Sequence, residues 1–224
     1  MKKNCNYIVY KFLKYTVGMF YILLYRPKVI NKGVIPKSGG VIICGNHFHA
    51  FDQFNVMMAL KRVPHYMAKR EYFDGVASLF SEPPTKLGCL LSKWAVEHAG
   101  MIIRVDRTGN VEEAKSEALE VLNQGKVLGL FPEGTRNNKE NPPPFLLPFK
   151  FGAVSMAQKT GAMIQPFAIT GEYKVFKKNH LNIRFGEPFK VPKTMDLQAA
   201  NEKLYNIVAD LKKQGLEDIK NGKY

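Results

Sequence analysis

The stretch that decides the fold is Val41–Asp52, which reads VIICGNHFHAFD. Its apolar, β-prone start ends at Gly45 and predicts a buried strand. Four polar side chains follow directly: Asn46, His47, His49 and Asp52. A polar cluster at the end of a buried strand is typical of a cleft. Histidine moves protons near neutral pH and a carboxylate can hold it in one tautomer, so the cluster is a candidate proton-transfer site. For this motif taken alone, a hydrogen-bonded loop cap is the simpler interpretation.

Apolar runs and amphipathic segments alternate along the rest of the chain. Further strands are expected at residues 65–68, 101–105, 127–131, 162–170 (interrupted by Pro166) and 182–185 (at a sheet edge). Helices are expected at residues 53–62, within 71–99, and at 111–122, 149–160 and 197–211. This alternation predicts an α/β fold, in which a single domain has a mixed β-sheet flanked by helices.

The N-terminal segment Tyr7–Tyr25 is aliphatic and aromatic, with Lys11 and Lys14 as its only charged residues. A membrane-spanning helix needs about 20 mostly apolar residues, and this segment has that length only if both lysines are counted. Tyr and Lys favour the headgroup level. We therefore expect residues 1–30 to form a membrane-associated helical segment that lies in one leaflet, followed by the main domain at residues 31–224. A true span and an ordinary core helix are the alternatives.

Net charge narrows the class of partner, and cysteine content narrows the redox compartment. The 224-residue chain has a net charge of +14, which suits an anionic membrane surface or a phosphorylated substrate. It has no nucleic-acid-binding signature, so no nucleic-acid partner is expected. The cysteines are three, widely separated and without a CxxC, which favours a reducing compartment over a disulfide scaffold or zinc site.

Two more strand ends carry polar groups. GMIIRVDR ends at Arg107, and FPEGTR, at residues 131–136, follows another expected strand. Because the carboxyl ends of strands in an α/β sheet lie along one edge, Arg107 and Arg136 could converge near His47. A guanidinium suits phosphate oxygens, and Gly134 allows backbone N–H groups to approach an anion. For each arginine taken singly, a solvated surface charge or a salt bridge is the simpler interpretation.

Four segments, NHFHAFD, GMIIRVDR, FPEGTR and IQPFAITG, resemble the sequence blocks of glycerolipid acyltransferases of the 1-acyl-sn-glycerol-3-phosphate acyltransferase type. They extend from Asn46 to Gly171 with the family's spacing, behind a hydrophobic segment. One departure is His49, because the family often has a small residue, commonly Ser, at this position.

The resemblance implies that a fatty acyl group moves from an acyl thioester, acyl-CoA or acyl-ACP, to the sn-2 hydroxyl of 1-acyl-glycerol-3-phosphate. Phosphatidic acid, for phospholipid biosynthesis, would be the product. His47 would be the general base, oriented by Asp52, with no acyl-enzyme. The resemblance assigns acceptor binding to Arg107, Glu133, Gly134, Thr135 and Arg136. No cofactor and no metal are expected. Another lysophospholipid or glycerol 3-phosphate is the alternative acceptor.

This pairing makes a demand on the local backbone. In a continuous helix, His49 would be the neighbour of Asp52, whereas His47 would lie about 140° away around the helix. The chain must therefore turn between His47, at the end of the strand, and Asp52, in the first turn of the helix.

The resemblance also implies a setting for the domain at residues 31–224. We expect a peripheral or monotopic protein of the cell membrane with its catalytic domain on the cytoplasmic side. Acyl carrier protein is a partner if acyl-ACP is the donor.

A metal-dependent hydrolase is one rival function, although His47-x-His49-x-x-Asp52 lacks the His-x-His-x-Asp-His spacing. A non-enzymatic membrane-binding module is another, and it leaves the polar strand ends unexplained.

Overall fold

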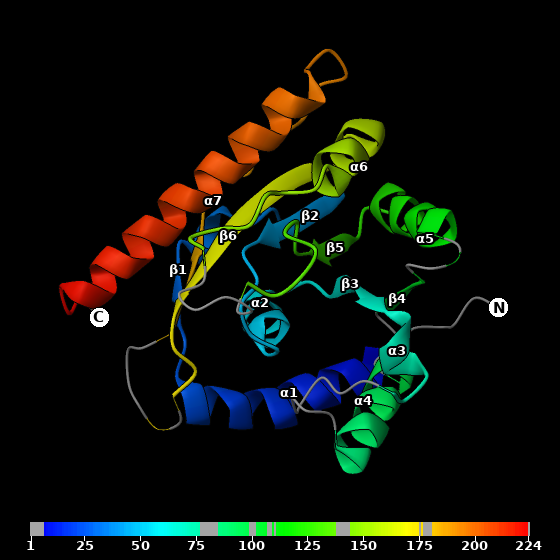
Figure 1. Ribbon diagram of the computed structural model, residues 1–224, viewed down its shortest axis with the longest axis vertical. Coiled ribbons are helices and arrows are strands. Elements are labelled where there is room, and N and C mark those ends of the chain that lie inside the picture. The colour runs from blue at the N-terminus through cyan, green and yellow to red at the C-terminus, as the bar shows by residue number, and fades with distance from the viewer. Residues whose placement is uncertain are drawn as a thin grey trace.

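The computed structural model describes residues 7–76, 85–98, 102–106, 109, 111–137, 144–174, 176 and 181–223. Within these residues the strands form one seven-stranded sheet in the order β1-β7-β6-β2-β5-β3-β4 (Figure 1). The strands are β1 (Lys28–Ile30), β2 (Val41–Gly45), β3 (Pro64–Lys69), β4 (Ile102–Val105), β5 (Val127–Leu130), β6 (Met163–Gly171) and β7 (Leu181–Phe185). Neighbours from β6 to β4 pair in parallel, β7 is antiparallel to β6, and β1 is parallel to β7. The sheet is mixed, as predicted.

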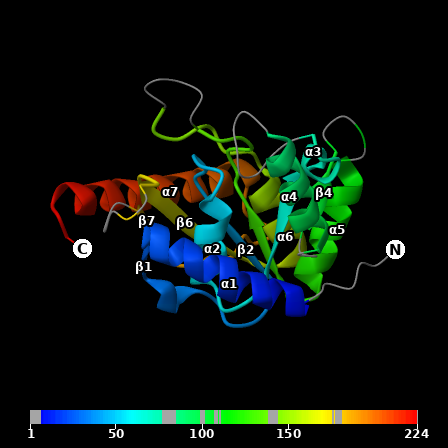
Figure 2. The same ribbon diagram turned by 90° about the horizontal axis from the view of Figure 1, so that it is seen from below.

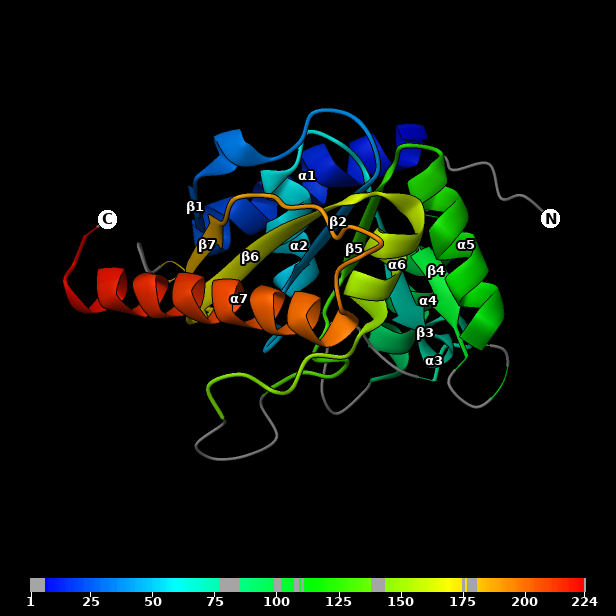
Figure 3. The same ribbon diagram turned by 90° about the horizontal axis from the view of Figure 1, so that it is seen from above.

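Helices cover both faces of this sheet (Figures 1 and 3). They are α1 (Tyr7–Tyr25), α2 (Asp52–Ala59), α3 (Arg70–Phe73), α4 (Lys86–His98), α5 (Val111–Asn123), α6 (Gly152–Thr160) and α7 (Leu197–Lys220), with a short 3₁₀ turn at Lys32–Val34. α5, α6 and α7 pack on one face and α2 on the other, and α1 lies on the side of α2 away from the sheet (Figure 2). The α/β prediction is therefore confirmed.

The central strand β2 divides the core into two. Ile42 and Cys44 belong to the cluster under α5, α6 and α7, whereas Val41 and Ile43 belong to the cluster under α2. Successive side chains of a strand point to opposite faces, and here both faces are covered. This explains why the sequence shows an unbroken apolar run at β2 in place of an alternation.

Two local predictions are wrong. Strand 182–185 is not at the edge, because β1 pairs outside it. Pro166 does not interrupt its strand, since β6 runs through it. Its carbonyl accepts from the N–H of Gly186 at 3.0 Å, and β6 pairs with β7 only from Phe167 onward. The N and C=O of one residue face the same neighbouring strand, so the missing donor falls just beyond the end of β7.

The N-terminal helix α1 has two different sides. Tyr10 and Tyr21 are buried, and Gly18 lies so close to α2 that an added Cβ would be 2.4 Å from Sδ of Met58. The other side is apolar and exposed, with the side chains of Ile8, Phe12, Tyr15, Met19, Phe20 and Leu23. α1 is therefore seated on α2 by one stripe and leaves an apolar stripe uncovered within the described residues.

None of the helices in the described part of the chain combines the length and the apolar character needed to cross a membrane. The division into a segment at residues 1–30 and a domain at 31–224, and the association of the first with a membrane, stay predictions.

Candidate active site

The polar strand ends meet at one edge of the sheet. β2, β5, β3, β4 and β6 are mutually parallel, so their carboxyl ends lie together. The His47 loop follows β2, the FPEGTR loop follows β5, and Glu172 and Tyr173 follow β6. Gly45 allows close packing here, because an added Cβ would be 2.1 Å from the backbone O of Phe167. This edge is where ligands bind in α/β sheets.

The backbone turns between His47 and Asp52, as the sequence pairing requires. β2 ends at Gly45 and α2 begins at Asp52. The Nδ1 atom of His47 lies 2.8 Å from Oδ2 of Asp52, which also accepts the backbone N–H groups of Phe48 at 2.7 Å and His49 at 2.8 Å. The carboxylate therefore closes the turn as well as contacting the imidazole, and the predicted contact is present.

This arrangement defines one tautomer of His47. Because Nδ1 faces a carboxylate, it carries the proton, and Nε2 is left as the acceptor. The side chain of His47 is 17% exposed and that of Asp52 is 0% exposed, so the pair has one accessible end. The imidazole stacks on Phe131, with ring centroids 4.0 Å apart. The geometry suits a base that accepts a proton at Nε2.

The FPEGTR loop holds the backbone of His47 from both sides. Oε1 of Glu133 accepts the N–H of His47 at 2.7 Å, and the N–H of Asn137 donates to the carbonyl of His47 at 2.7 Å. Oε2 of Glu133 accepts the N–H of Leu147 at 2.8 Å. Burial raises the pKa of Glu133, while these backbone donors oppose the rise. Both oxygens of Glu133 are thus engaged with the protein itself.

Three of the other expected acceptor-binding residues lie together in the FPEGTR loop. Gly134 (φ 72°) closes a turn through its N–H to the carbonyl of Phe131 at 3.0 Å, and Thr135 and Arg136 follow it partly buried. Arg136 is close enough to His49 to disfavour its protonation. Arg107 lies outside the described residues.

His49 occupies a different environment from His47. Its Nδ1 accepts the backbone N–H of Phe51 at 3.2 Å, and its ring stacks on Tyr173 with centroids 3.9 Å apart. Burial is the main cause that lowers the pKa of His49; Asp52 opposes the shift and Arg136 adds to it. The ring of His49 therefore does not take the place of His47 beside Asp52.

Comparison with known proteins identifies the family of this chain. The profile of the Acyltransferase family matches residues 26–170, which include His47, Asp52 and the FPEGTR loop. The chain belongs to the Acyltransferase family.

Named relatives and a solved structure agree with this assignment. The 1-acyl-sn-glycerol-3-phosphate acyltransferase of Bacillus subtilis is 29% identical over 184 residues, which cover 80% of this chain and 82% of that protein. The protein of the same name from Borreliella burgdorferi is 30% identical over 147 residues, 65% of this chain but only 51% of that protein. The crystal structure of the 1-acyl-sn-glycerophosphate (LPA) acyltransferase PlsC from Thermotoga maritima is similar in fold. Its TM-score is 0.64 at 20% identity, over 95% of this chain and 80% of that one.

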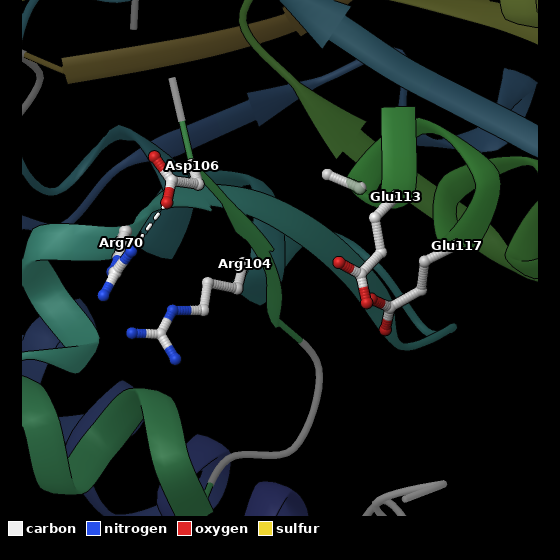
Figure 4. Close-up of a pocket in the computed structure, with 6 residues that line it drawn as sticks. Arg70, Arg104, Asp106, Glu113 and Glu117 are labelled. Atoms are coloured by element: carbon white, nitrogen blue, oxygen red, sulfur yellow. Dashed lines mark hydrogen bonds and ion pairs between the residues drawn. The ribbon is translucent and has the colours of Figure 1, made fainter. Parts of the chain in front are cut away.

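The acyltransferase also has a polar cavity of about 360 Å³ at the ends of β3 and β4 (Figure 4). Arg70 and Arg104 line one side, and Glu113 and Glu117 of α5 line the other. Both arginines already pair with aspartates: Arg70 donates to Asp106 at 2.7 Å, and both contact Asp74. The charges of this cavity are therefore largely balanced. It includes neither residue of the His47–Asp52 pair.

Sequence reasoning missed one important group in this acyltransferase. Tyr173 donates to Oδ1 of Asp52 at 2.6 Å, and Asn55 and Tyr21 continue the contact toward α1. Tyr173 lies two residues beyond the end of β6, at the same sheet edge as His47, and that position was the available signal. The other two residues lie within helices, where a polar side chain gives no sign of its partner.

Proposed function

We propose that this acyltransferase transfers a fatty acyl group from an acyl thioester to the sn-2 hydroxyl of 1-acyl-glycerol-3-phosphate and forms phosphatidic acid. The contact of 2.8 Å between Nδ1 of His47 and Oδ2 of the fully buried Asp52 carries this proposal. The names of the two bacterial relatives support the choice of acceptor.

In this mechanism His47 is the general base and Asp52 holds it. Nε2 of His47 takes the proton of the sn-2 hydroxyl as the hydroxyl oxygen attacks the thioester carbonyl carbon. The C–S bond then breaks, the ester C–O bond remains, and the imidazolium returns its proton to the leaving thiolate. A positioned base of this kind contributes about 10²- to 10⁴-fold to the rate. The buried charge of Asp52 stabilises the imidazolium during the step.

No acyl-enzyme is needed for this transfer. The thiol of Cys44 is fully buried, and burial raises its pKa far above the usual range, so it does not form a thiolate nucleophile. The donor is acyl-CoA or acyl-ACP, and both release a thiol.

We assign the acceptor phosphate to Arg136 together with Arg107. Arg136 follows the turn at Gly134 and lies near the imidazole of His49, where its guanidinium forms charge-assisted bonds to phosphate oxygens. The hydroxyl of Thr135 adds a donor beside it, and Gly134, whose N–H closes the turn onto the carbonyl of Phe131, shapes the loop at this point. Glu133 contributes by holding His47, because its own oxygens are occupied.

A metal-dependent hydrolase finds no support in the geometry. Within the described residues, no group of three or more His, Cys, Asp or Glu side chains is arranged to hold a metal ion. Oδ2 of Asp52 is surrounded by the donors of His47, Phe48 and His49, which leaves it poorly placed to bind a cation.

We further propose that the exposed stripe of α1 enters the cytoplasmic leaflet of the cell membrane as a peripheral or monotopic anchor. Each buried methylene is worth about 0.8 kcal/mol, so extracting a long acyl chain into water costs on the order of 10 kcal/mol. An enzyme that works at the surface avoids this penalty. The net charge of +14 favours an anionic leaflet.

The test is a thiol-release assay on the purified 224-residue chain with acyl-CoA and acyl-ACP. The acceptors are 1-acyl-glycerol-3-phosphate, a lysophospholipid with a larger headgroup, glycerol 3-phosphate, and none. We expect the fastest release with 1-acyl-glycerol-3-phosphate, and phosphatidic acid by mass spectrometry. A preference for another acceptor would reassign the substrate, and release that needs no acceptor would indicate a thioesterase.

A further inference from the structure

An unbroken chain of hydrogen bonds connects α1 with Asp52. The Tyr21 hydroxyl donates to Oδ1 of Asn55 at 2.7 Å, and Nδ2 of Asn55 donates to the hydroxyl oxygen of Tyr173 at 2.8 Å. The Tyr173 hydroxyl donates to Oδ1 of Asp52 at 2.6 Å. Every donor points toward the carboxylate, so each bond polarises the next in the same sense.

The chain is shielded from water for most of its length. Asp52, Asn55 and Tyr21 are 0%, 1% and 6% exposed. Burial raises the pKa of Tyr21 and Tyr173, so both phenols stay protonated and remain donors. A hydrogen bond to a buried charge is stronger and more directional than one in water.

The two oxygens of Asp52 have separate tasks. Oδ2 contacts His47 and accepts the backbone N–H groups of Phe48 and His49, and Oδ1 is held by Tyr173. The terminal torsion of an aspartate has a broad energy well, so the carboxylate rotates more freely when one oxygen is released. Rotation of the carboxylate displaces the acceptor of the His47 proton. Tyr173 therefore acts on the imidazole through Asp52 and touches no substrate in doing so.

The Tyr21 end of this chain of hydrogen bonds is held in place by the packing of α1 on α2. Nζ of Lys14 donates to the backbone O of Leu60 at 2.5 Å, just after α2. The N–H of Phe176 donates to the carbonyl of Leu24 at 2.8 Å, which ties the end of α1 to the segment after Tyr173. A displacement of α1 would therefore move both Tyr21 and the segment that carries Tyr173.

We propose that Tyr173 is a positioning residue for the Asp52 carboxylate and that Tyr21 extends this support to α1, so that the seating of α1 on α2 sets the rate of acyl transfer. The inference rests on the proposed function, because it concerns residues that support the His47–Asp52 pair. It gives α1 a part in the reaction in addition to anchoring.

Three Tyr→Phe variants of the enzyme test this chain of hydrogen bonds, because each removes one hydroxyl and keeps the ring. We expect Tyr173→Phe to lower kcat by about tenfold to hundredfold, the loss associated with one hydrogen bond to a charged group. Tyr21→Phe should lower kcat by about threefold, as for a neutral hydrogen bond. KM for both substrates should stay within about twofold, since the chain contacts neither.

Tyr25→Phe is the matched control. Tyr25 is on the same helix, and its ring packs 5.0 Å from that of Tyr21 and 5.6 Å from that of Tyr173, but its hydroxyl is not part of the chain. We expect wild-type kcat from this variant. The double variant Tyr21→Phe/Tyr173→Phe should be no slower than Tyr173→Phe, because the far link has no effect once the near one is cut.

A measurement without turnover separates this inference from the proposed reaction. In NMR spectra of the resting enzyme, the Nδ1 proton of His47 should shift in Tyr173→Phe and remain in place in Tyr25→Phe. The inference is overturned by wild-type kcat and an unshifted proton in Tyr173→Phe, or by independent effects in the double variant. If the enzyme carried out no acyl transfer but the Nδ1 proton of His47 still shifted in Tyr173→Phe, the proposed reaction would be wrong. The inference that Tyr173 supports Asp52 would remain valid.

Discussion

Oε1 of Glu133 accepts the backbone N–H of His47 at 2.7 Å, across 86 positions of the chain. The same carboxylate accepts the N–H of Leu147 through its other oxygen. Glu133 thus joins three segments at the sheet edge: the loop after β2, the loop after β5 and the segment that leads to α6. The position of the His47 imidazole, the proposed base, depends on this carboxylate as well as on Asp52.

Glu133→Gln should therefore lower both stability and kcat. A glutamine offers one oxygen and turns an NH₂ group toward the second backbone N–H, so one buried donor is left without an acceptor. We expect a loss of about 1–3 kcal/mol in the free energy of unfolding, measured by urea denaturation, and a kcat reduced by roughly tenfold for a misplaced base. Glu117→Gln, on the exposed side of α5, is the control. A raised acceptor KM with unchanged kcat would instead return Glu133 to the phosphate site, as the family resemblance implies.

The sequence predicted the fold well where the signal is local. The strands β2 and β6 are buried on both faces and the amphipathic helices α5 and α7 on one, and each kind of burial leaves its own pattern in the sequence. β1 was missed because three residues are too short for a pattern; it exists only through its pairing with β7. Pro166 was misjudged because its missing N–H faces the side of β7, and β7 pairs with β6 only from Phe167 onward.

The site divides in the same way. His47 and Asp52 lie in one short block, so their contact followed from the turn that the block requires. The part of Glu133 was not predictable, because a buried carboxylate that accepts backbone N–H groups has the same sequence signature as one that binds substrate. Tyr173 was missed since its partner Asp52 is 121 positions away.

Arg136→Ala should weaken use of the phosphorylated acceptor. One charge-assisted contact to phosphate is lost, so we expect the acceptor KM to rise by about tenfold to hundredfold while the donor KM stays unchanged. Arg136→Lys should restore the affinity only in part, because a point charge replaces a planar fork. Lys115→Ala on α5 removes a positive charge elsewhere and is the control for net charge. Equal acceptor affinity in the wild type and Arg136→Ala would remove Arg136 from the acceptor site.

Replacing the exposed apolar stripe of α1 should detach the enzyme from membranes. Phe12, Phe20 and Leu23 are 60% or more exposed, so their change to Ser should leave the fold intact. Each loses about 1.5–3 kcal/mol of transfer free energy when the side chain is fully buried in lipid, which predicts a drop of at least tenfold in vesicle affinity. Sedimentation with phosphatidylcholine–phosphatidylglycerol vesicles measures it, and Leu216→Ser on α7 is the control. Undiminished binding by the triple variant would show that α1 is not the principal anchor.

The burial of His49 should make the folded state less stable in mild acid. Its pKa in the folded protein lies below the ordinary value of 6.5 because burial penalises the imidazolium. Below about pH 6.5 the unfolded chain binds a proton at His49 that the folded protein does not yet bind. The contribution of His49 to the free energy of unfolding is therefore present above about pH 6.5 and is lost as the pH falls through the folded-state pKa.

Urea unfolding at pH 7.5 and pH 5.5 tests this in the wild type and in His49→Phe, which keeps an aromatic ring to stack on Tyr173. We expect the wild type to lose more stability between the two pH values than the variant. His65 is also partly buried and has a lowered pKa, so part of the pH dependence remains in His49→Phe and is reduced in His65→Phe. Identical pH dependence in the wild type and His49→Phe would show that folding does not lower the pKa of His49.

The two imidazoles of the first block should separate clearly in activity. His47 contacts Asp52 through Nδ1 and its side chain is 17% exposed, whereas Nδ1 of His49 accepts a backbone N–H and its ring lies on Tyr173. We expect His47→Ala to lower kcat by about 10²- to 10⁴-fold, the share of a general base, with an unchanged circular-dichroism spectrum. His49→Ser should keep substantial activity, since it loses a stacking contact and no proton acceptor. Steady-state kinetics on both purified variants, with thermal unfolding as a check of folding, decides between them. A fully active His47→Ala enzyme would refute the proposed base, and an inactive, folded His49→Ser beside it would assign that task to His49.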